Sequence, residues 1–345
     1  MLRFVEINDD LKKEHEKTNE DRSLNMSNRV ENLRNDSRSG KRKKRRRIIL
    51  IILGIIFAVL IYFALDIFFR VNDLFNRIHH EVDSIDWRAQ HGLPELTLDE
   101  TPFSVLILGI DRDGPADHGR SDTIMVATVN PNEGTTYLLS IARDTRTLMV
   151  GLDFDDKINH AFAFGGTEMA INSVQHFLNI PIDYYAELDM SGFGPLIDAV
   201  GGVRVYNDTV AFTQDGHTFP LGYVDLDSHA AMAYISMRFQ DPHGDFGRQQ
   251  RQRAIIGAMA SEMAGIRVVT RYQAIIDATG DHLRTDIHLR EMIRMSTRYT
   301  RALRNVIPLE LRGEGQIING IYYHIIAEDQ RLEMSQRLRR HLELE

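Results

Sequence analysis

One long apolar segment constrains the fold of this chain more than any other feature. Residues 48–65 are eighteen consecutive residues without a charge, and fourteen of them are Ile, Leu, Phe or Val. That length is close to what an α-helix needs to cross the hydrocarbon core of a bilayer. On insertion scales these side chains together favour the membrane by roughly 4–8 kcal/mol. The segment predicts a transmembrane helix, which we assign to residues 48–69.

The charges on either side of this segment predict its orientation. Seven consecutive basic residues, Lys41 to Arg47, precede it, whereas the residues after it mix Arg70 with Asp73. Because loops rich in Lys and Arg stay on the cytoplasmic side, residues 1–47 are expected in the cytoplasm and the rest outside the cell. The alternative is a cleaved signal peptide. The tail is too long for one, the apolar core exceeds the usual length, and no A-x-A site follows.

The composition differs between the two sides of the predicted membrane segment. The first 47 residues carry 15 Lys and Arg against 9 Asp and Glu, and the remainder carries 26 against 40. An acidic outer part argues against a nucleic-acid partner, and the basic block fits a contact with anionic lipids of the cytoplasmic membrane. The polar tail, residues 1–47, is expected to be disordered. Without any cysteine, disulfides and thiol chemistry are excluded.

A second, shorter pattern follows the predicted span. Val71, Leu74, Ile78, Val82 and Ile85 recur at steps of three and four residues, which predicts an amphipathic juxtamembrane helix, with a linker, over residues 70–100. Docking of this helix on its own domain is the simpler expectation. Pairing with a second copy of the chain is the alternative.

Beyond this linker, short apolar runs alternate with longer helical patterns. Strands are predicted at 103–109, 123–129, 136–141 and 183–188, and helices at 159–178, 227–238 and 246–264. Strands interleaved with helices are typical of an α/β domain with a largely buried sheet. No repeat or low-complexity linker divides this part of the sequence. We therefore expect one extracellular α-β-α domain, residues 101–345, with a central mixed sheet.

Charged and amide side chains gather where the predicted strands and helices begin or end. Carboxylates there offer hard oxygen ligands for Mg²⁺, and guanidinium groups offer forked donors for phosphate oxygens. Each element alone also fits a helix cap, a surface ion pair or a solvated helix face. Without further information, these residues support only an α/β domain with a candidate anion site. The candidate site residues are Asp111, Arg120, Asp122, Arg143, Arg238, Arg248 and Gln252.

The order of seven sequence blocks identifies a family. Over residues 103–264 the chain resembles the LytR-CpsA-Psr family of cell-wall glycopolymer transferases. The predicted membrane anchor with a short cytoplasmic tail also fits that family's architecture. The matching blocks are LILGID, GRSDTIMVATVNP, LLSIARDT, KINHAFAFGG, IDYYAELDMSGF, DAVGGV and MRFQDPHGDFGRQQRQRAII.

The resemblance implies a Mg²⁺-dependent phosphotransferase. Such an enzyme moves a teichoic acid or capsular glycopolymer from an undecaprenyl pyrophosphate carrier to a peptidoglycan hydroxyl, at C6 of N-acetylmuramic acid. It implies that Asp111 and Asp122 hold Mg²⁺, that Arg120, Arg143, Arg238 and Arg248 act on the pyrophosphate, and that Gln252 lies close by. The lipid pyrophosphate is already activated, and the chain has no GxxxxGK[ST] motif for a nucleotide.

Two parts of this interpretation stay open at the level of sequence. Asp144 is a candidate general base without further support, so the base is unassigned. Phe162 and Phe193 are candidate walls of a tunnel for the lipid tail, but the same residues suit an ordinary hydrophobic core.

Two positions depart from the family's pattern. Ala142 replaces the proline of SIPRD, which affects the backbone alone. Ser236 stands where an arginine is frequent, and it offers only a weak hydrogen-bonding substitute for a phosphate donor. Neighbouring arginines compensate for that loss, or the chain is slower or uses a different carrier.

Two further functions use the same residues. One is a membrane-bound regulator, a transcriptional attenuator that binds polyprenyl phosphate, although residues 1–47 show no helix-turn-helix pattern. The other is a lipid pyrophosphatase, in which water replaces the sugar hydroxyl. The products of the reaction distinguish hydrolysis from transfer.

Overall fold

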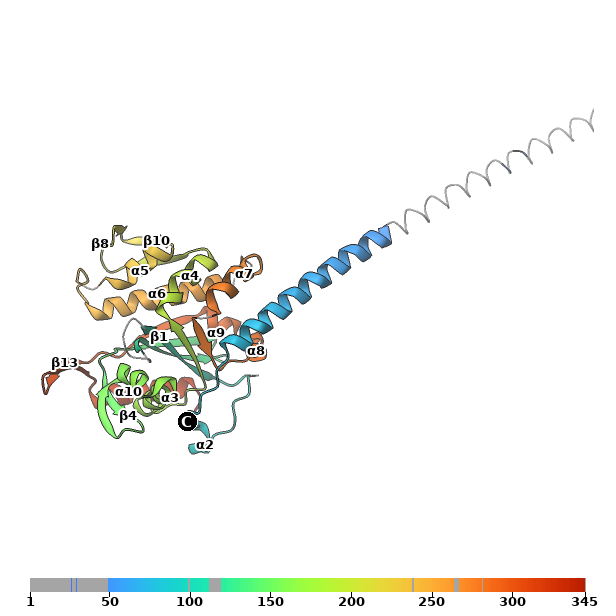
Figure 1. Ribbon diagram of the computed structural model, residues 1–345. Coiled ribbons are helices and arrows are strands. Elements are labelled where there is room, and N and C mark those ends of the chain that lie inside the picture. The colour runs from blue at the N-terminus through green and yellow to red at the C-terminus, as the bar shows by residue number, and fades with distance from the viewer. Residues whose placement is uncertain are drawn as a thin grey trace, which may run out of the picture. The chain divides into compact units, whose positions relative to one another are not determined.

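The structure, a computed structural model, describes residues 26, 29, 49–98, 100–111, 119–237, 239–263, 267–280 and 282–344 (Figure 1). The chain divides into two compact units, Met1–Phe69 and Arg70–Glu345. The predicted cytoplasmic tail, residues 1–47, lies almost wholly outside the described residues.

The apolar segment forms the long helix Ile49–Ile78. It has 30 residues and a mean hydropathy of 2.8 in its most apolar window. At 1.5 Å per residue, such a helix exceeds the roughly 30 Å hydrocarbon core of a bilayer. Large side chains such as Ile52 and Phe63 are exposed along it, as expected for a helix whose partner is lipid. The helix therefore has the length and the surface of a membrane anchor.

The second apolar pattern is only partly helical. Leu74, Phe75 and Ile78 are buried in a small cluster with Ile276, as predicted for docking on the domain. The helix then ends at Ile78, and the prediction that it continues to Ile85 is wrong. The reason is a tertiary contact: His79 forms an isolated parallel bridge with residue 285, which requires an extended backbone. A short helix, α2 (Trp87–Gln90), follows.

The domain is built on a six-stranded mixed sheet of order β11-β6-β1-β2-β3-β12. Strands β1, β2 and β3 form an antiparallel meander, β6 lies parallel to β1, and β12 lies parallel to β3. The strands are β1 (Phe103–Asp111), β2 (Arg120–Asn130), β3 (Thr135–Ile141), β6 (Tyr184–Asp189), β11 (Leu283–Thr285) and β12 (Val306–Glu310). The four strands predicted from the sequence are β1, β2, β3 and β6.

Two helices cover one face of this sheet, α3 (Ile158–Leu178) and α10 (Glu328–His341) (Figure 1). Strand residues that point to this face, such as Leu106, Leu108 and Val126, form one core with Ile171 of α3 and Leu338 of α10. Alternate residues of a strand face opposite sides, so the same strands also present a second buried face.

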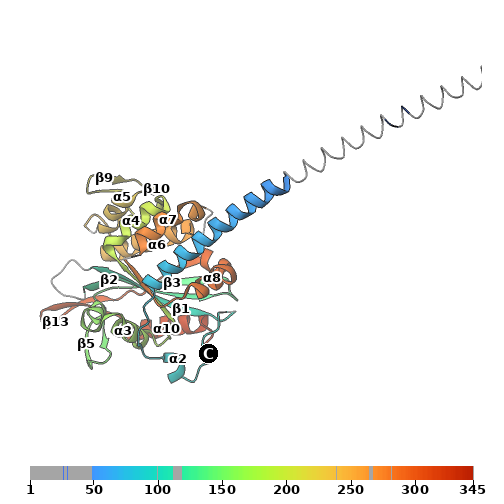
Figure 2. The same cartoon turned by 45° about the vertical axis from the view of Figure 1, so that its right-hand side comes forward.

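Four helices cover the opposite face, as both views show (Figures 1 and 2). They pack around a second core that includes Phe193, Ile197 and Ile255. Met125 and Leu138 of the sheet contact Ile256 of this layer. The fold is thus the α-β-α domain with a mixed sheet that the sequence predicts. The helices are α4 (Met190–Val200), α5 (Ser228–Ser236), α6 (Asp245–Met263) and α7 (Arg267–Thr279).

The remaining described elements are small two-stranded sheets and short helices outside the main sheet. Four two-stranded sheets pair β4 with β5, β7 with β10, β8 with β9, and β13 with β14. These are β4 (Arg146–Met149), β5 (Phe154–Lys157), β7 (Val203–Asn207), β8 (Phe212–Gln214), β9 (His217–Phe219), β10 (Gly222–Leu226), β13 (Glu314–Ile318) and β14 (Ile321–Ile325), with short helices α8 (Leu289–Arg298) and α9 (Thr300–Arg304).

Candidate functional site

The end of β1 and the start of β2 place an acidic and a basic residue side by side. Asp111 pairs with Arg120 in the antiparallel register, and residues 112–118 between the strands lie outside the described part. Gly119 has a φ of +63°, and a Cβ there would lie 2.5 Å from the Asp111 carbonyl oxygen. Only glycine fits this close approach, so it fixes the return of the chain into β2.

A β-bulge at Asp122 determines which side chains face the site. Gly109 pairs with Thr123 but Ile110 pairs with Ser121, which leaves Asp122 as the extra residue of β2. Without the bulge, strict alternation would turn Arg120 to the face that α3 covers. With it, Arg120 shares the α6 face with Thr123. Bulges next to active sites commonly re-aim side chains in this way.

Four charged side chains form a continuous row at this edge of the sheet. Arg143 Nη1 donates to Asp122 Oδ2 at 2.7 Å, and Arg143 Nε lies 3.7 Å from Asp144 Oδ2. Lys157 Nζ donates to the other oxygen of Asp144 at 2.7 Å. Each of the four keeps about a fifth to a quarter of its side chain exposed, so the row is accessible from solvent. Sequence reasoning named Asp122 and Arg143 but gave Lys157 no role in the site.

The start of α3 is hydrogen-bonded to the backbone that carries this row. The N–H groups of Ile158 and Asn159 donate to the carbonyl oxygens of Thr145 and Arg143, at 2.8 and 3.2 Å. The Asn159 side chain is buried, and its Oδ1 has no hydrogen-bond partner among the described residues. Sequence reasoning missed Asn159, although it lies within the quoted block KINHAFAFGG.

A further carboxylate, that of Asp156 on β5 next to Lys157, is held by hydrogen bonds. Asp156 contacts His160 Nδ1 at 2.8 Å through one oxygen and accepts from the Tyr323 hydroxyl at 3.2 Å through the other. Burial alone would raise the pKa of Asp156, but these contacts, together with the Lys157 backbone N–H, hold it below its usual range. Asp156 is therefore a fixed anion that orients His160.

Helix α6 brings two amides to the same place. Gln249 and Gln252 line a narrow pocket together with Asp122, Ser140 and Arg143. Within the described part of the chain, the buried Gln252 Oε1 and Ser140 Oγ make no hydrogen bond. Buried polar atoms are nearly always paired in folded proteins, and such atoms beside charged groups are expected where a polar ligand binds. The structure thus brings three of the candidate site residues, Asp122, Arg143 and Gln252, to one pocket.

The arginines of the run that begins α6 have different surroundings. Arg248 is only 5% exposed at the start of the helix. Arg251 forms a buried ion pair with Asp241, and Arg253 donates to Glu310 at 2.7 Å. Arg238, the remaining predicted phosphate ligand, lies outside the described residues. Of the run, Arg251 and Arg253 are occupied by structural contacts.

Arg253 and Glu310 perturb each other. Burial lowers the pKa of Arg253 despite its acidic partner. Glu310 is partly buried, which would raise its pKa, but Arg312 and Arg253 hold the pKa of this carboxyl below its usual range. The pair joins α6 to the edge strand β12.

The donor set at the strand ends fits Mg²⁺. Asp122 offers carboxylate oxygens beside the Gln252 and Ser140 oxygens, which have no hydrogen-bond partner among the described residues, and Asp111 offers a second carboxylate at the end of β1. Mg²⁺ prefers oxygen ligands and retains several waters, so one or two carboxylates suffice to hold it.

The two phenylalanines predicted as lipid contacts lie in different layers. Phe162 is buried in the core between the sheet and α3, and Phe193 is buried in the core of the α4–α7 layer. The structure does not bring them together. Whether either contacts a lipid tail stays a prediction.

Comparison with known proteins agrees with the fold. The model of the LytR_cpsA_psr family matches residues 71–340. A protein of Halalkalibacterium halodurans named polyisoprenyl-teichoic acid–peptidoglycan teichoic acid transferase TagU is 42% identical over 295 residues, which are 85% of this chain and 97% of that protein.

Solved structures show the same architecture. The crystal structure of B. subtilis TagU is 36% identical, with a TM-score of 0.59 over 70% of this chain and 97% of that one. A structure described as TagT bound to LIIa-WTA is 27% identical, with a TM-score of 0.61 over 72% of this chain and 94% of that one.

Proposed function

The chain belongs to the LytR-CpsA-Psr family, and we propose that it is a polyisoprenyl-teichoic acid–peptidoglycan teichoic acid transferase. The donor is a glycopolymer on undecaprenyl pyrophosphate, and the acceptor is a muramic acid hydroxyl of peptidoglycan. The relatives with this name are similar to this chain over nearly their whole length, which supports assigning their full activity to it. The observation that supports the chemistry is the Asp122–Arg143 contact beside Arg120 at one edge of the sheet.

Arg120, Arg143 and Arg248 bind the pyrophosphate in this proposal. Phosphoryl transfer needs its negative charge neutralised and its oxygens aligned more than it needs a covalent intermediate. Guanidinium groups on a rigid scaffold supply both, because their donors are planar and their charge is permanent. Asp122 fixes the orientation of Arg143 through the 2.7 Å contact. Arg238 is assigned the same role from the sequence alone.

Asp111 and Asp122 would hold Mg²⁺ in this proposal, with Gln252 nearby. When bound, the ion supplies charge neutralisation of the pyrophosphate, which makes the lipid phosphate a better leaving group. Arg143 contacts the same carboxylate, so the protein balances the charge of Asp122 and holds its position.

Asp144 is less suited to act as the general base than the sequence alone allows. One of its oxygens is occupied by Lys157 Nζ, and the other faces Arg143. Both oxygens thus face cationic side chains, and an incoming hydroxyl would have to displace one of these contacts to reach the carboxylate. We propose that Asp144 and Lys157 position Arg143 instead, and that binding and alignment provide most of the rate.

The long apolar helix places the enzyme at its substrate. We propose that residues 48–69 span the cytoplasmic membrane, that residues 1–47 lie in the cytoplasm, and that residues 101–345 form the extracellular catalytic domain. The basic residues before the helix and the acidic composition after it support this orientation. A lipid-linked donor in the outer leaflet then lies within reach of the domain.

The proposal is tested with the full-length protein in detergent, a lipid-pyrophosphate-linked saccharide and peptidoglycan fragments. We expect a covalent saccharide–peptidoglycan product that requires Mg²⁺. Arg143→Ala and Asp122→Ala should each lower its rate by about two to three powers of ten, because Arg143 stabilises the transition-state charge and Asp122 holds both Mg²⁺ and Arg143. Arg204→Ala, which breaks an exposed ion pair with Asp225, is the matched control and should keep the wild-type rate.

The nature of the product decides between the candidate functions. Free glycan phosphate without labelled peptidoglycan would indicate a pyrophosphatase, and bound lipid without turnover would indicate a binding regulator. Unchanged rates in both site variants would refute the assignment of these residues.

A further inference from the structure

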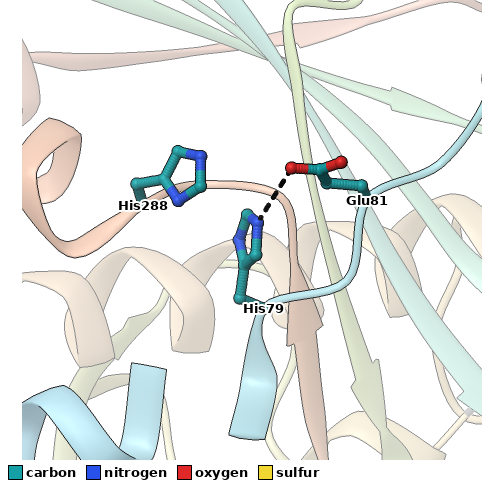
Figure 3. Close-up of side chains that lie close together, drawn as sticks. All are labelled: His79, Glu81 and His288. Atoms are coloured by element: carbon teal, nitrogen blue, oxygen red, sulfur yellow. Dashed lines mark ion pairs between the residues drawn. The ribbon is translucent and has the colours of Figure 1, made fainter. Parts of the chain in front are cut away.

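Three metal-binding side chains meet at a place remote from the charged row. His79 and Glu81 follow the end of the long helix, and His288 precedes α8 (Figure 3). One ligand atom from each of the three lies within 4.8 Å of those of the other two. In Figure 3 the carboxylate of Glu81 and the ring of His288 lie on two sides of the His79 ring.

The backbones that carry these side chains are fastened to each other. His79 forms a bridge with Thr285, and the N–H of His80 donates to the Thr285 carbonyl oxygen at 2.9 Å. The Tyr185 hydroxyl donates to the carbonyl oxygen of His80 at 2.7 Å. The N–H of His288 donates to Glu291 Oε2 at 2.8 Å, which fixes the start of α8. Backbone contacts therefore hold the segments that carry His79, Glu81 and His288 close together.

The side chains are not satisfied by contacts with each other. Both ring nitrogens of His79 are buried, and within the described residues neither makes a hydrogen bond. Glu81 Oε1 lies 3.7 Å from His79 Nε2, which is longer than a normal hydrogen bond. The rings of His79 and His288 stack with their centroids 4.1 Å apart. Buried ring nitrogens need a hydrogen-bonding or metal partner, and the described residues supply none within hydrogen-bond distance.

We propose that His79, Glu81 and His288 bind one divalent transition-metal ion, for which Zn²⁺ is the probe. Two imidazoles and one carboxylate are a donor set that suits zinc, and a water completes four-fold coordination. Zn–N and Zn–O distances of about 2.0–2.2 Å place donor atoms roughly 3.4 Å apart, so the site contracts on binding.

The exposure of two of the ligands permits this contraction. Glu81 and His288 are exposed, which leaves their side chains room to turn toward the half-buried His79. Because a metal lies in the plane of an imidazole, the His288 ring leaves the stack when it coordinates. The bound ion ties the segment after the long helix to the start of α8 and stabilises the folded domain.

The site differs in chemistry from the strand-end carboxylates. Imidazole favours zinc and its neighbours in the first transition series, while carboxylate and carbonyl oxygens favour magnesium. Excess Mg²⁺ should therefore not displace Zn²⁺ here. The proposal stands independently of the transferase activity.

The test is zinc titration of the full-length protein in detergent micelles, purified through a tag without histidine. We expect one saturable site by calorimetry, and a thermal unfolding midpoint that rises with zinc concentration. His79→Ala, His288→Ala and Glu81→Gln should each weaken binding by more than about tenfold. His80→Ala is the matched control, because this exposed neighbour contributes through its backbone carbonyl and contacts Ile78 O with its ring.

Two results would overturn the proposal. One is the absence of a saturable zinc site in the wild type. The other is equal zinc affinity in the His79, His288 and His80 variants. Glu81→Gln keeps the test informative if a histidine variant fails to fold, because Glu81 is exposed and its charge is removed without loss of volume.

Discussion

At the scale of single residues, His341 is a buried imidazole between two hydroxyl groups. Its Nδ1 contacts Thr128 Oγ1 at 2.8 Å and its Nε2 contacts Thr135 Oγ1 at 2.9 Å. The ring stacks on Tyr137 with centroids 4.0 Å apart. Burial lowers the pKa of His341, and nearby Arg337 lowers it further, although Glu133 and Glu343 partly offset this effect. The residue therefore joins α10 to the sheet in its neutral form.

This environment predicts a loss of stability in mild acid. Because the pKa of His341 is lower in the folded state, the unfolded chain binds the extra proton as the pH falls below about 6.5. The free energy of unfolding should therefore be unaffected by this group above that pH and decrease below it. His341→Gln keeps hydrogen-bonding groups without a titration, so its stability should fall less steeply on acidification.

The measurement is chemical denaturation of the full-length protein over a series of pH values. His229→Gln, at an exposed histidine, is the control and should keep the wild-type slope. An equal slope in wild type and His341→Gln would contradict the prediction.

The residue scale also shows what sequence alone reveals about the site. Asp122, Arg143 and Gln252, which line one pocket, were named as candidates because each belongs to a block that resembles the family. The β-bulge at Asp122 was not, since it depends on pairing with Gly109 and Ile110 and leaves no periodic signal. Asn159 was missed because a lone asparagine in a helical pattern is far more often a cap or surface residue.

At the scale of elements, helix α6 begins where a buried ion pair fixes it. Arg251 pairs with Asp241, and both side chains are at most 5% exposed. Arg251 Nε also donates to the carbonyl oxygen of Tyr234 at 2.9 Å in α5. A Cβ on Gly247 would lie 1.8 Å from an Asp241 oxygen, so glycine is required there. This pair locates Arg248 and Gln252 relative to the sheet.

Removal of one partner should therefore destabilise the domain strongly. Asp241→Ala leaves the Arg251 charge buried without its partner, which typically costs about 3–5 kcal/mol in the free energy of unfolding. Asp225→Ala breaks the exposed Arg204–Asp225 pair, which is the matched control and should leave stability close to wild type. Chemical denaturation measures both, and comparable stability of the two variants would show that the buried pair is unimportant.

The elements were the most predictable part of the molecule. The predicted helices 159–178, 227–238 and 246–264 match α3, α5 and α6 closely. The short strands β11 and β12 were missed. Strands of 3 and 5 residues at a sheet edge carry too few alternating positions for a pattern.

The sequence also did not distinguish arginines that form structural ion pairs from arginines that are candidates for phosphate binding. Arg251 and Arg253 are partnered by Asp241 and Glu310, which are 10 and 57 residues away in the chain. Periodicity reports local structure and not the identity of a distant partner. Only the three-dimensional contacts distinguish these structural arginines from Arg143, whose partner Asp122 lies in the site.

At the scale of the whole molecule, the long apolar helix should determine where the protein resides. The helix Ile49–Ile78 carries its large apolar side chains exposed, and this composition was read directly from the sequence. The compact unit Arg70–Glu345 contains the sheet and both of its helical layers. Location and chemistry therefore reside in separate parts of the chain.

Deletion of residues 1–69 should release the protein from the membrane. The full-length chain should sediment with membranes, and the deletion variant should stay in the supernatant after ultracentrifugation. With donor in vesicles, the deletion should lower the transfer rate about a hundredfold at equal enzyme concentration, because the anchor supplies a high effective concentration.

The same donor in detergent should restore the rate of the deletion variant to near that of the full-length protein. An unrelated apolar helix in place of residues 48–69 should restore membrane transfer too, if the anchor acts only by location. Failure of both experiments would mean that residues 1–69 contribute to the site itself.

The position of β12 and α10 in the sheet and core has a consequence for biosynthesis. Strand β12 pairs with β3, and Leu338 and Leu342 fill the core above β1 and β2. The last sequence block that carries the family resemblance ends at Ile256, so a nascent chain can contain every quoted motif before β12 and α10 have been made. Completion of the sheet and its core must therefore wait until α10 has been synthesised, and a chain that stops before α10 would expose that core to proteases although its site motifs are intact.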